Sequence, residues 1–168
     1  MKKFELTTEF ITNAFGKKLF RIKALVEFGD VKAGELGGYV EKEGNVSQAG
    51  NAWVYGNARV YGDARVYGNA EVYGNAWVSG NARVSGNARV SSDADYALVQ
   101  GFGTEFRCTT FYRGKNKKIM VNCGCFHGDL EGFRKQVKET RNGKIAKEYL
   151  MIADLMEYHF TSEDSSNE

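Results

Sequence analysis

The sequence has no proline, and only three cysteines and two histidines occur among its 168 residues. An odd number of cysteines in a chain of one domain's length favours free thiols over disulfide bonds. No run approaches the roughly 18 apolar residues that a membrane-spanning helix needs. The net charge of +2 indicates no general affinity for nucleic acid or membranes. The N-terminus turns acidic and polar before any apolar segment, so we expect a cytoplasmic protein without a secretory signal or a membrane partner.

Glycine, by contrast, is abundant at 20 residues, and seven of these glycines open the units of an internal repeat. From 50 to 91 the chain reads GNAWVY, GNARVY, GDARVY, GNAEVY, GNAWVS, GNARVS and GNARVS. Each Gly-Asn or Gly-Asp pair tolerates the left-handed backbone of a sharp corner, whereas proline would fix φ. A chain that turns every six residues without a reversal signal is expected to coil, with its short strands stacked in parallel.

This pattern resembles the hexapeptide repeat of left-handed β-helix proteins, in which three hexapeptides form one coil around a triangular core. The resemblance implies three inner columns, which are Val54 with Val72 and Val90, Val60 with Val78, and Val66 with Val84, with the repeat alanines in narrower inner positions. Seven units complete little more than two coils, and the degenerate stretches 38–49 and 92–97 would extend the stack towards three.

The flanks of the repeat have a different pattern. Strand-like runs at 3–7 and 18–27 indicate a small β cap, and 105–112 with 118–126 predict a hairpin. Apolar residues at helical spacing follow Asp129, a candidate N-cap, and the same spacing recurs over 146–160. The polar residues 161–168 are expected to fray.

The predicted fold is therefore mainly β, with a short left-handed parallel β-helix at its centre. An N-terminal β cap with the opening coil occupies 1–49, the hexapeptide-repeat β-helix occupies 50–97, and a ββαα subdomain, a β-hairpin plus two helices, occupies 98–168.

Two stretches of the flanks, RIKALVEFGDVKAGELGGYVEKEGN and VNCGCFHGDLEGF, carry a second resemblance. They are similar to parts of hexapeptide-repeat proteins encoded by bacteriophages and prophages, and the similarity runs over nearly the whole chain. It implies an origin and an architecture, and it assigns no catalytic residue.

The outward positions of the repeat hold aromatic residues and arginine, although the fold would accept any residue there. Stacked by coil, one face carries Trp53, Glu71 and Arg89 beside Tyr55 and Tyr73, the second Arg59 and Trp77 beside Tyr61, and the third Arg65 and Arg83 beside Tyr67. One interpretation is the interface of a homotrimer, because β-helix proteins of this kind usually form trimers and these residue types are enriched at interfaces.

The other interpretation is a binding site for a small anionic ligand such as a nucleotide. Arginine forks bind phosphate in a bidentate manner, and aromatic rings stack on bases. The candidate ligand-binding residues are Arg59, Arg65, Arg83, Arg89, Tyr55, Tyr61, Tyr67, Trp53 and Trp77. An uninvolved surface lysine such as Lys3 should tolerate replacement at nearly no cost.

The cysteines and the basic turn offer weaker candidates. Cys108, Cys123, Cys125 and His127 could form a zinc site, but small buried thiols are the favoured interpretation. The turn with Arg113, Lys115, Lys117 and Lys118 is a second place for an anion, although such a hairpin tip is more often simply solvated.

These observations favour a non-catalytic binding protein without a cofactor. The phage resemblance makes it an expected antagonist of bacterial defence in the host cytoplasm, a trimer that sequesters a phosphate-bearing signal. One alternative is an inhibitor that occludes a host defence protein by direct contact. The other is a hexapeptide-repeat acyltransferase, which would need a histidine base, and the only histidines, His127 and His159, lie outside the repeat.

Overall fold

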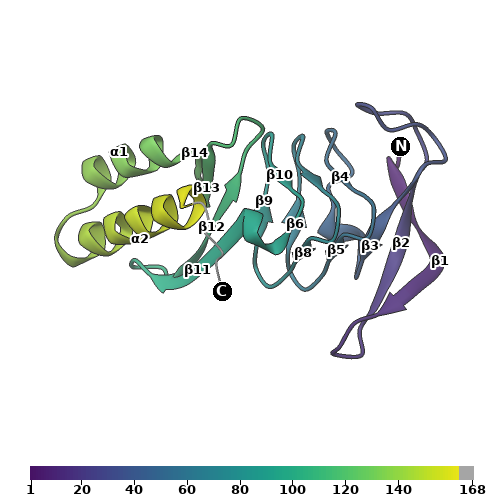
Figure 1. Cartoon of the computed structure of the whole chain (residues 1–168), viewed down its shortest axis with the longest axis horizontal. Helices are drawn as coiled ribbons and strands as arrows, with labels where there is room; N and C mark the ends of the chain where they lie inside the picture. The colour runs from purple at the N-terminus through teal and green to yellow at the C-terminus, as the bar shows by residue number, and fades with distance from the viewer. Residues whose placement is uncertain (163–168) are drawn as a thin grey trace.

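The computed structural model describes residues 1–162 and arranges three parts along one axis (Figure 1). A β cap lies at one end, the repeat in the middle, and a sheet covered by two helices at the other end. The fraying expected near the C-terminus falls largely on 163–168, which lie outside the described residues.

The cap contains strands β1 (Phe4–Thr12), β2 (Lys18–Ala24) and β3 (Leu36–Val40), followed by the short 3-10 helix η1 (Glu43–Asn45). Each repeat contributes one two-residue strand, namely β4 (Trp53–Val54), β5 (Arg59–Val60), β6 (Arg65–Val66), β7 (Glu71–Val72), β8 (Trp77–Val78), β9 (Arg83–Val84) and β10 (Arg89–Val90). The C-terminal part comprises η2 (Asp93–Asp95), β11 (Tyr96–Phe102), β12 (Arg107–Arg113), β13 (Ile119–Cys123), β14 (Phe126–Asp129), α1 (Leu130–Thr140) and α2 (Gly143–Thr161).

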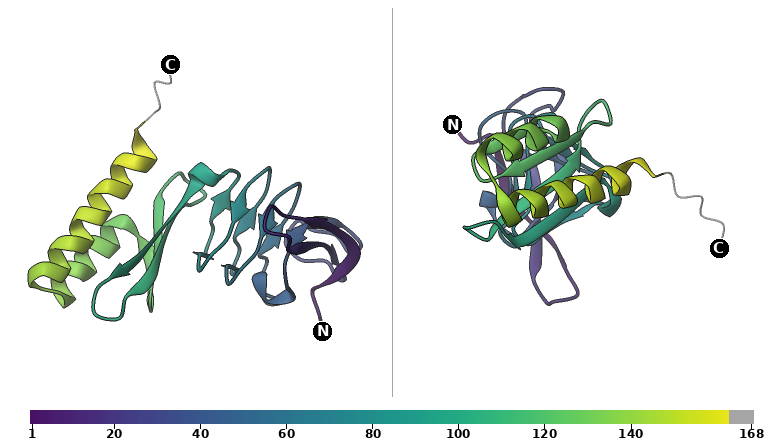
Figure 2. Two further views of the ribbon diagram at one scale, coloured as in Figure 1. Left: turned by 90° about the horizontal axis from the view of Figure 1, so that it is seen from below. Right: turned by 90° about the vertical axis from the view of Figure 1, so that its left-hand side faces the viewer.

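The repeat strands stack in parallel with partners three repeats further along the chain (Figure 2). Backbone amides of one coil donate to carbonyls of the next, as from Trp53 to Ala70 at 3.0 Å and from Arg65 to Ala82 at 2.9 Å. The ladders are β3-β5-β8, β4-β7-β10 and β6-β9, and they confirm all three predicted valine columns. These parallel ladders fit a β-helix, and we call this central part the solenoid.

Alanine and valine fill the solenoid, and glycine turns its corners. The alanine and valine of every repeat have no exposed surface, so each unit adds apolar burial to one continuous core. All seven repeat glycines have φ between +63° and +69°, a left-handed conformation. A Cβ on Gly50 would also lie 2.6 Å from the carbonyl oxygen of Gly68, because adjacent coils touch at the corners.

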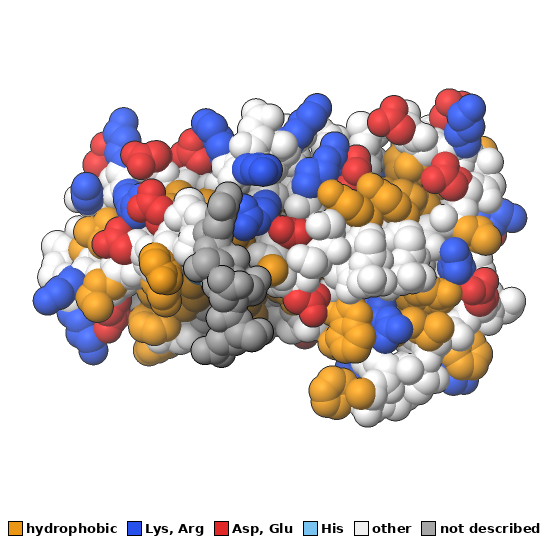
Figure 3. Space-filling view, viewed as in Figure 1, with side chains coloured by type: hydrophobic (Ala, Val, Ile, Leu, Met, Phe, Trp, Pro, Cys, Tyr) orange, Lys and Arg blue, Asp and Glu red, His pale blue; other side chains and the backbone are white. Residues whose placement is uncertain are grey.

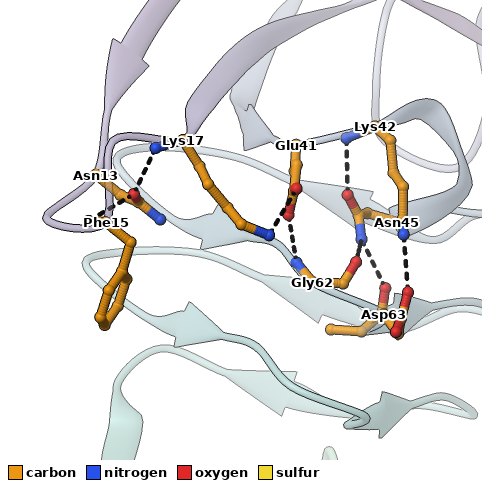
Figure 4. Close-up of polar contacts among 9 residues, drawn as sticks. Asn13, Phe15, Lys17, Glu41, Lys42, Asn45, Gly62 and Asp63 are labelled. Carbon is orange, nitrogen blue, oxygen red and sulfur yellow. Dashed lines mark hydrogen bonds and ion pairs between the residues drawn. The ribbon is translucent and has the colours of Figure 1, made fainter.

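The first coil is formed by the degenerate stretch of the sequence, and its side chains bind backbone groups at the edge of the coil that follows. Val40 pairs with Val60 and Val46 with Val66, so this stretch joins the stack as expected. Figure 4 shows the side chains of Glu41 and Asn45 reaching Gly62. The Asn45 amide donates to the carbonyls of Gly62 and Ala64 at 3.2 and 2.9 Å. These contacts occupy edge groups that could otherwise pair with another chain.

Lys3 covers another part of the same edge. Its ammonium group donates to the carbonyls of Gly50 and Ala52 at 3.2 and 2.8 Å and lies 4.7 Å from the centre of the Phe28 ring. The residue is only 4% exposed. The expectation that Lys3 is an uninvolved surface lysine is therefore wrong. The N-terminal strand brings it against a coil nearly fifty residues away, which its local sequence does not reveal.

The stability of the protein should depend on pH through Lys3. Burial lowers the pKa of the Lys3 ammonium from its ordinary value of 10.5 to about 8. Between these two values the unfolded chain holds a proton that the folded chain has released, so the free energy of unfolding should rise with pH in this window. We expect the difference in stability between wild type and Lys3→Met, measured by urea unfolding, to rise from pH 8 to 10. A difference that stays constant would contradict this assignment.

The chain leaves the solenoid at η2, and residues 92–97 add no further parallel strand. Side chains instead form hydrogen bonds with the free backbone amides and carbonyls of the last coil. The amide of Trp77 donates to Asp93 at 2.7 Å, that of Arg83 donates to Thr110 at 3.0 Å, and the Asn122 amide donates to the Arg83 carbonyl at 2.8 Å. The C-terminal sheet is thus fastened to the solenoid by specific hydrogen bonds.

The predicted hairpin is present as β12 and β13, but it is the centre of a four-stranded antiparallel sheet, β11-β12-β13-β14. The ββαα description of the C-terminal subdomain is corrected accordingly. Helices α1 and α2 pack on this sheet through a second apolar cluster that includes Phe111, Phe133 and Ile152. Asp129 is the N-cap of α1, as predicted, and accepts from the amide of Gly132 at 2.8 Å.

Candidate functional site

The outward residues form the three predicted columns, with one exception in exposure. The ladders place Trp53, Glu71 and Arg89 in one column, Arg59 and Trp77 in another, and Arg65 and Arg83 in the third. Trp53, however, is only 2% exposed, because the rings of Phe4 and Phe28 from the N-terminal cap pack against it edge-on. The expectation that Trp53 faces a ligand is therefore wrong.

The charges of the first column neutralise one another. Arg89 forms a 2.6 Å ion pair with Glu71, and the Tyr55 hydroxyl donates to the same carboxylate at 3.2 Å. Tyr55 stacks on Tyr73 with ring centroids 5.1 Å apart. Burial, followed by the charge of Glu71, raises the pKa of Tyr55 to about 12. This column leaves no cation free for an anionic ligand.

The second column is a stack of guanidinium groups and aromatic rings. The Arg59 guanidinium lies 4.8 Å from the centre of the Trp77 ring, and that of Arg21 lies 5.3 Å from the centre of the Tyr39 ring. Tyr39 pairs with Arg59 across the ladder, so the two contacts are neighbours. Arg59 is thereby held by an aromatic ring, and the neighbouring Tyr61 is half-buried.

The third column differs because its two arginines have no acidic partner in the part of the chain that the structure describes. Arg65 and Arg83 are directly opposite each other on strands about 4.8 Å apart. Both are exposed, and neither forms an ion pair with any carboxylate of residues 1–162. The nearby Asp63 is bound to Lys42 at 2.8 Å, and this contact lowers the pKa of the Asp63 carboxyl. Like charges opposite each other in a sheet are destabilising, so this pair is suited to an anion.

Two hollows flank the arginine pair, and both are lined by Arg65, Tyr67 and Arg83. One, of about 590 Å³, extends towards Glu43 and Gln48 of the first coil. The other, of about 540 Å³, extends to the C-terminal sheet and adds Phe106 and Arg107. The site therefore combines three guanidinium groups with two aromatic rings.

Phe106 and Arg107 are members of this site that the sequence analysis missed. Phe106 is the last residue of the turn between β11 and β12, and Arg107 is the first residue of β12. Only the docking of that sheet on the solenoid brings them to the repeat. Phe106 has φ +49°, a left-handed conformation that is costly for an aromatic residue, and its side chain is 67% exposed. A strained backbone that holds an exposed ring beside arginines is typical of a binding site.

The proposed zinc ligands are not brought together. Cys108 donates to the carbonyl of Asn81, Thr109 donates to Cys123, and His127 contacts the Tyr112 hydroxyl at 3.2 Å. Among the residues that the structure describes, no group of three or more His, Cys, Asp and Glu side chains is arranged to hold a metal ion.

The thiols are less buried than expected. Cys125 is exposed at the turn between β13 and β14, and Cys108 and Cys123 are half-buried. Partial burial raises the pKa of the Cys108 thiol.

The basic turn between β12 and β13 is only partly available to an anion. Arg113 pairs with Asp95 at 3.2 Å, and Lys118 lies 3.8 Å from Asp129. Lys115 and Lys117 of this turn form no ion pair within residues 1–162, but they lack the planar guanidinium groups of Arg65 and Arg83 that bind phosphate in a bidentate manner.

Comparison with known proteins supports the solenoid. Three segments of the repeat, 52–68, 64–80 and 82–94, match the model of the YdcK Beta solenoid repeat family. The central repeat is similar to this β-solenoid family. A search of curated proteins found no significant match. None of the helices within 1–162 is long and apolar enough to cross a membrane.

Proposed function

We propose that the protein is a non-catalytic binding protein that sequesters a small phosphate-bearing ligand of the nucleotide type at Arg65 and Arg83. The observation that carries this proposal is the stacked arginine pair, which has no carboxylate partner among residues 1–162. A phosphate between the two guanidinium groups would replace their mutual repulsion with charge-assisted hydrogen bonds. Tyr67 and Phe106, which line the adjoining hollows, would offer ring faces to a base.

A role in binding is better supported than acyl transfer. The transferase alternative needs a histidine base beside its substrate. His127 contacts Tyr112, the ring of His159 packs against Phe160, and neither lines the two hollows. We therefore assign no proton transfer to this site.

The biological part of the proposal rests on the resemblance to phage and prophage proteins. In this account the protein acts in the host bacterial cytoplasm as an antagonist of defence, by withholding a nucleotide-type signal. The solenoid is left-handed, as in the hexapeptide-repeat proteins that it resembles.

We further propose a homotrimer formed through the second column and the β1–β2 hairpin. Phe10, Phe15 and Trp77 are 44%, 79% and 39% exposed on these elements. Figure 3 shows apolar side chains gathered around a basic one near β5 and β8. Such a patch is more typical of an interface than of a surface in water.

Light scattering should therefore give about three times the chain mass of 18.7 kDa at micromolar concentrations. Phe15→Ser should lower the assembled mass, because this side chain lies at the projecting tip of the hairpin. A wild-type mass equal to one chain would contradict the trimer. The same aromatic surface would then favour the second candidate function, direct occlusion of a host defence protein.

Calorimetry against mono-, di- and cyclic nucleotides tests the main proposal. We expect at least one of these ligands to bind in the micromolar range, and chromatography of the recovered ligand should show it unchanged. Binding confined to the millimolar range would contradict sequestration. A ligand recovered cleaved or acylated would show that the protein is an enzyme.

A further inference from the structure

The nine arginines of the chain divide into two groups by their contacts. Four form ion pairs with carboxylates, namely Arg21, Arg89, Arg113 and Arg134, and Arg59 lies on Trp77. The other four, Arg65, Arg83, Arg107 and Arg141, are all exposed and have no ion pair within residues 1–162.

These four arginines line three hollows that share lining residues, and we call the three hollows together the groove. The hollow beside the first coil and the hollow beside the C-terminal sheet share Arg65 and Arg83. The second of these shares Arg107 and Gly124 with a third, smaller hollow of about 80 Å³, which Arg141 also lines. The groove thus runs from the first coil, across the solenoid, to the C-terminal end of α1.

The order of the arginines along the groove follows from the packing of β12 against the last coil. Thr110 accepts the amide hydrogen of Arg83, and the Cys108 thiol donates to the carbonyl of Asn81. β12 therefore lies beside β9, in the layer that follows Arg83. Thr110 lies next to Arg83 itself, and Arg107 is displaced along β12 towards Asn81. Arg141, the C-cap of α1, comes last.

The carboxylates along the groove do little to cancel this charge. Glu43 is bound to Lys2 at 2.9 Å, and Asp63 is bound to Lys42 at 2.8 Å. Glu105, which lines the third hollow, is the one groove carboxylate within 1–162 that has no ion pair. The groove is therefore positive along its length, although the whole chain carries a charge of only +2.

We propose that this groove binds a linear phosphodiester strand, a short single-stranded oligonucleotide, with successive phosphates at Arg65, Arg83, Arg107 and Arg141. This inference rests on the proposed function and extends its ligand from one nucleotide to several. A positive groove that follows the backbone, with aromatic rings for the bases, is the usual arrangement for single-stranded nucleic acid. Phe106 and Tyr67 lie in the middle of the groove and are the stacking residues.

Fluorescence anisotropy with 5′-phosphorylated, 3′-labelled oligothymidylates of one to six nucleotides, each of which carries as many phosphates as nucleotides, tests this inference. For wild type we expect the affinity to rise at least tenfold from one to four nucleotides and then to level off. For the four-nucleotide strand, the slope of log affinity against log salt should be about −2.8, because each phosphate contact contributes about −0.7 for single strands.

Arg141→Ala separates the two proposals. It should lower the affinity for the four-nucleotide strand by about tenfold and bring the salt slope to about −2.1. The affinity for a mononucleotide should stay unchanged. Lys147→Ala removes one exposed positive charge of α2 that lies outside the groove, and it should change the affinity for neither ligand. Phe106→Gly should lower the affinity for the oligonucleotide, because a stacking ring is lost. It should not lower the melting temperature, because glycine accepts the positive φ without strain.

Three outcomes would separate the strand proposal from the proposed function. Equal affinities for one and four nucleotides would overturn the strand proposal and leave the proposed function intact. A strand affinity that Arg141→Ala and Lys147→Ala reduce equally would also overturn it, because this would indicate only a response to net charge. If neither ligand bound, both proposals would be wrong.

Discussion

Replacement of both Arg65 and Arg83 with alanine should lower the affinity for a phosphate ligand by about a thousandfold. Each charge-assisted fork is worth about 1.5–3 kcal/mol, or roughly ten- to a hundredfold. The two residues contact one ligand, so their effects need not add. Calorimetry on the single and double variants measures both the loss and the coupling.

The same double variant should be more stable than wild type when no ligand is present. It removes two like charges that face each other in the ladder. Arg65→Lys with Arg83→Lys retains the charge and loses the planar fork, so it should lie between wild type and the alanine variant in affinity. Arg59→Ala should keep wild-type affinity, because Arg59 stacks on Trp77 in another column. An alanine double variant that binds as wild type does would refute the site.

Gly37→Ala should strongly destabilise the protein, because Gly37 of β3 lies where the cap meets the solenoid. A Cβ at this position would lie 2.5 Å from the Val54 carbonyl oxygen and 2.8 Å from the Trp53 ring. The backbone and the buried ring cannot move aside cheaply, so we expect a loss of about 2–3 kcal/mol. For a chain of this size the melting temperature should fall by about 5–10 °C.

Gly44→Ala is the matched control. It makes the same substitution in the same part of the chain, but no atom lies within 4 Å of its added Cβ. Its melting temperature in calorimetric scans should stay within a degree or two of wild type. Equal melting temperatures for the two variants would mean that β3 does not pack on the solenoid as described.

The solenoid could be predicted from the sequence because each repeat obeys a local rule. Glycine takes the corner, alanine and valine take the interior, and the period of the coil then fixes which residues stack. The same period places Glu71 beside Arg89, so the neutralisation of the first column was also contained in the sequence. It follows from column order alone.

The cap and the C-terminal sheet could not be predicted in the same way. Trp53 occupies an outward position of the repeat, and only the folding of Phe4 and Phe28 over it makes it a core residue. Strands β11 and β14 pair with β12 and β13. Both contain a glycine, and β14 has only four residues, so their own sequences give little signal.

The candidate site was therefore only half visible in the sequence. Arg65, Arg83 and Tyr67 repeat with the coil and could be named. Phe106 and Arg107 depend on how a separate sheet docks, and the absence of ion pairs depends on where each carboxylate of the described residues lies. The distinction among the four repeat arginines is thus a property of tertiary packing.

A crystal structure of the protein with a nucleoside diphosphate, at near-physiological salt, is the most direct test of the account. We predict phosphate oxygens about 2.7–2.9 Å from the guanidinium nitrogens of both Arg65 and Arg83, with the base against Tyr67 or Phe106. Phosphate bound instead at the turn with Arg113 and Lys117, or an empty arginine column at saturating ligand, would contradict it.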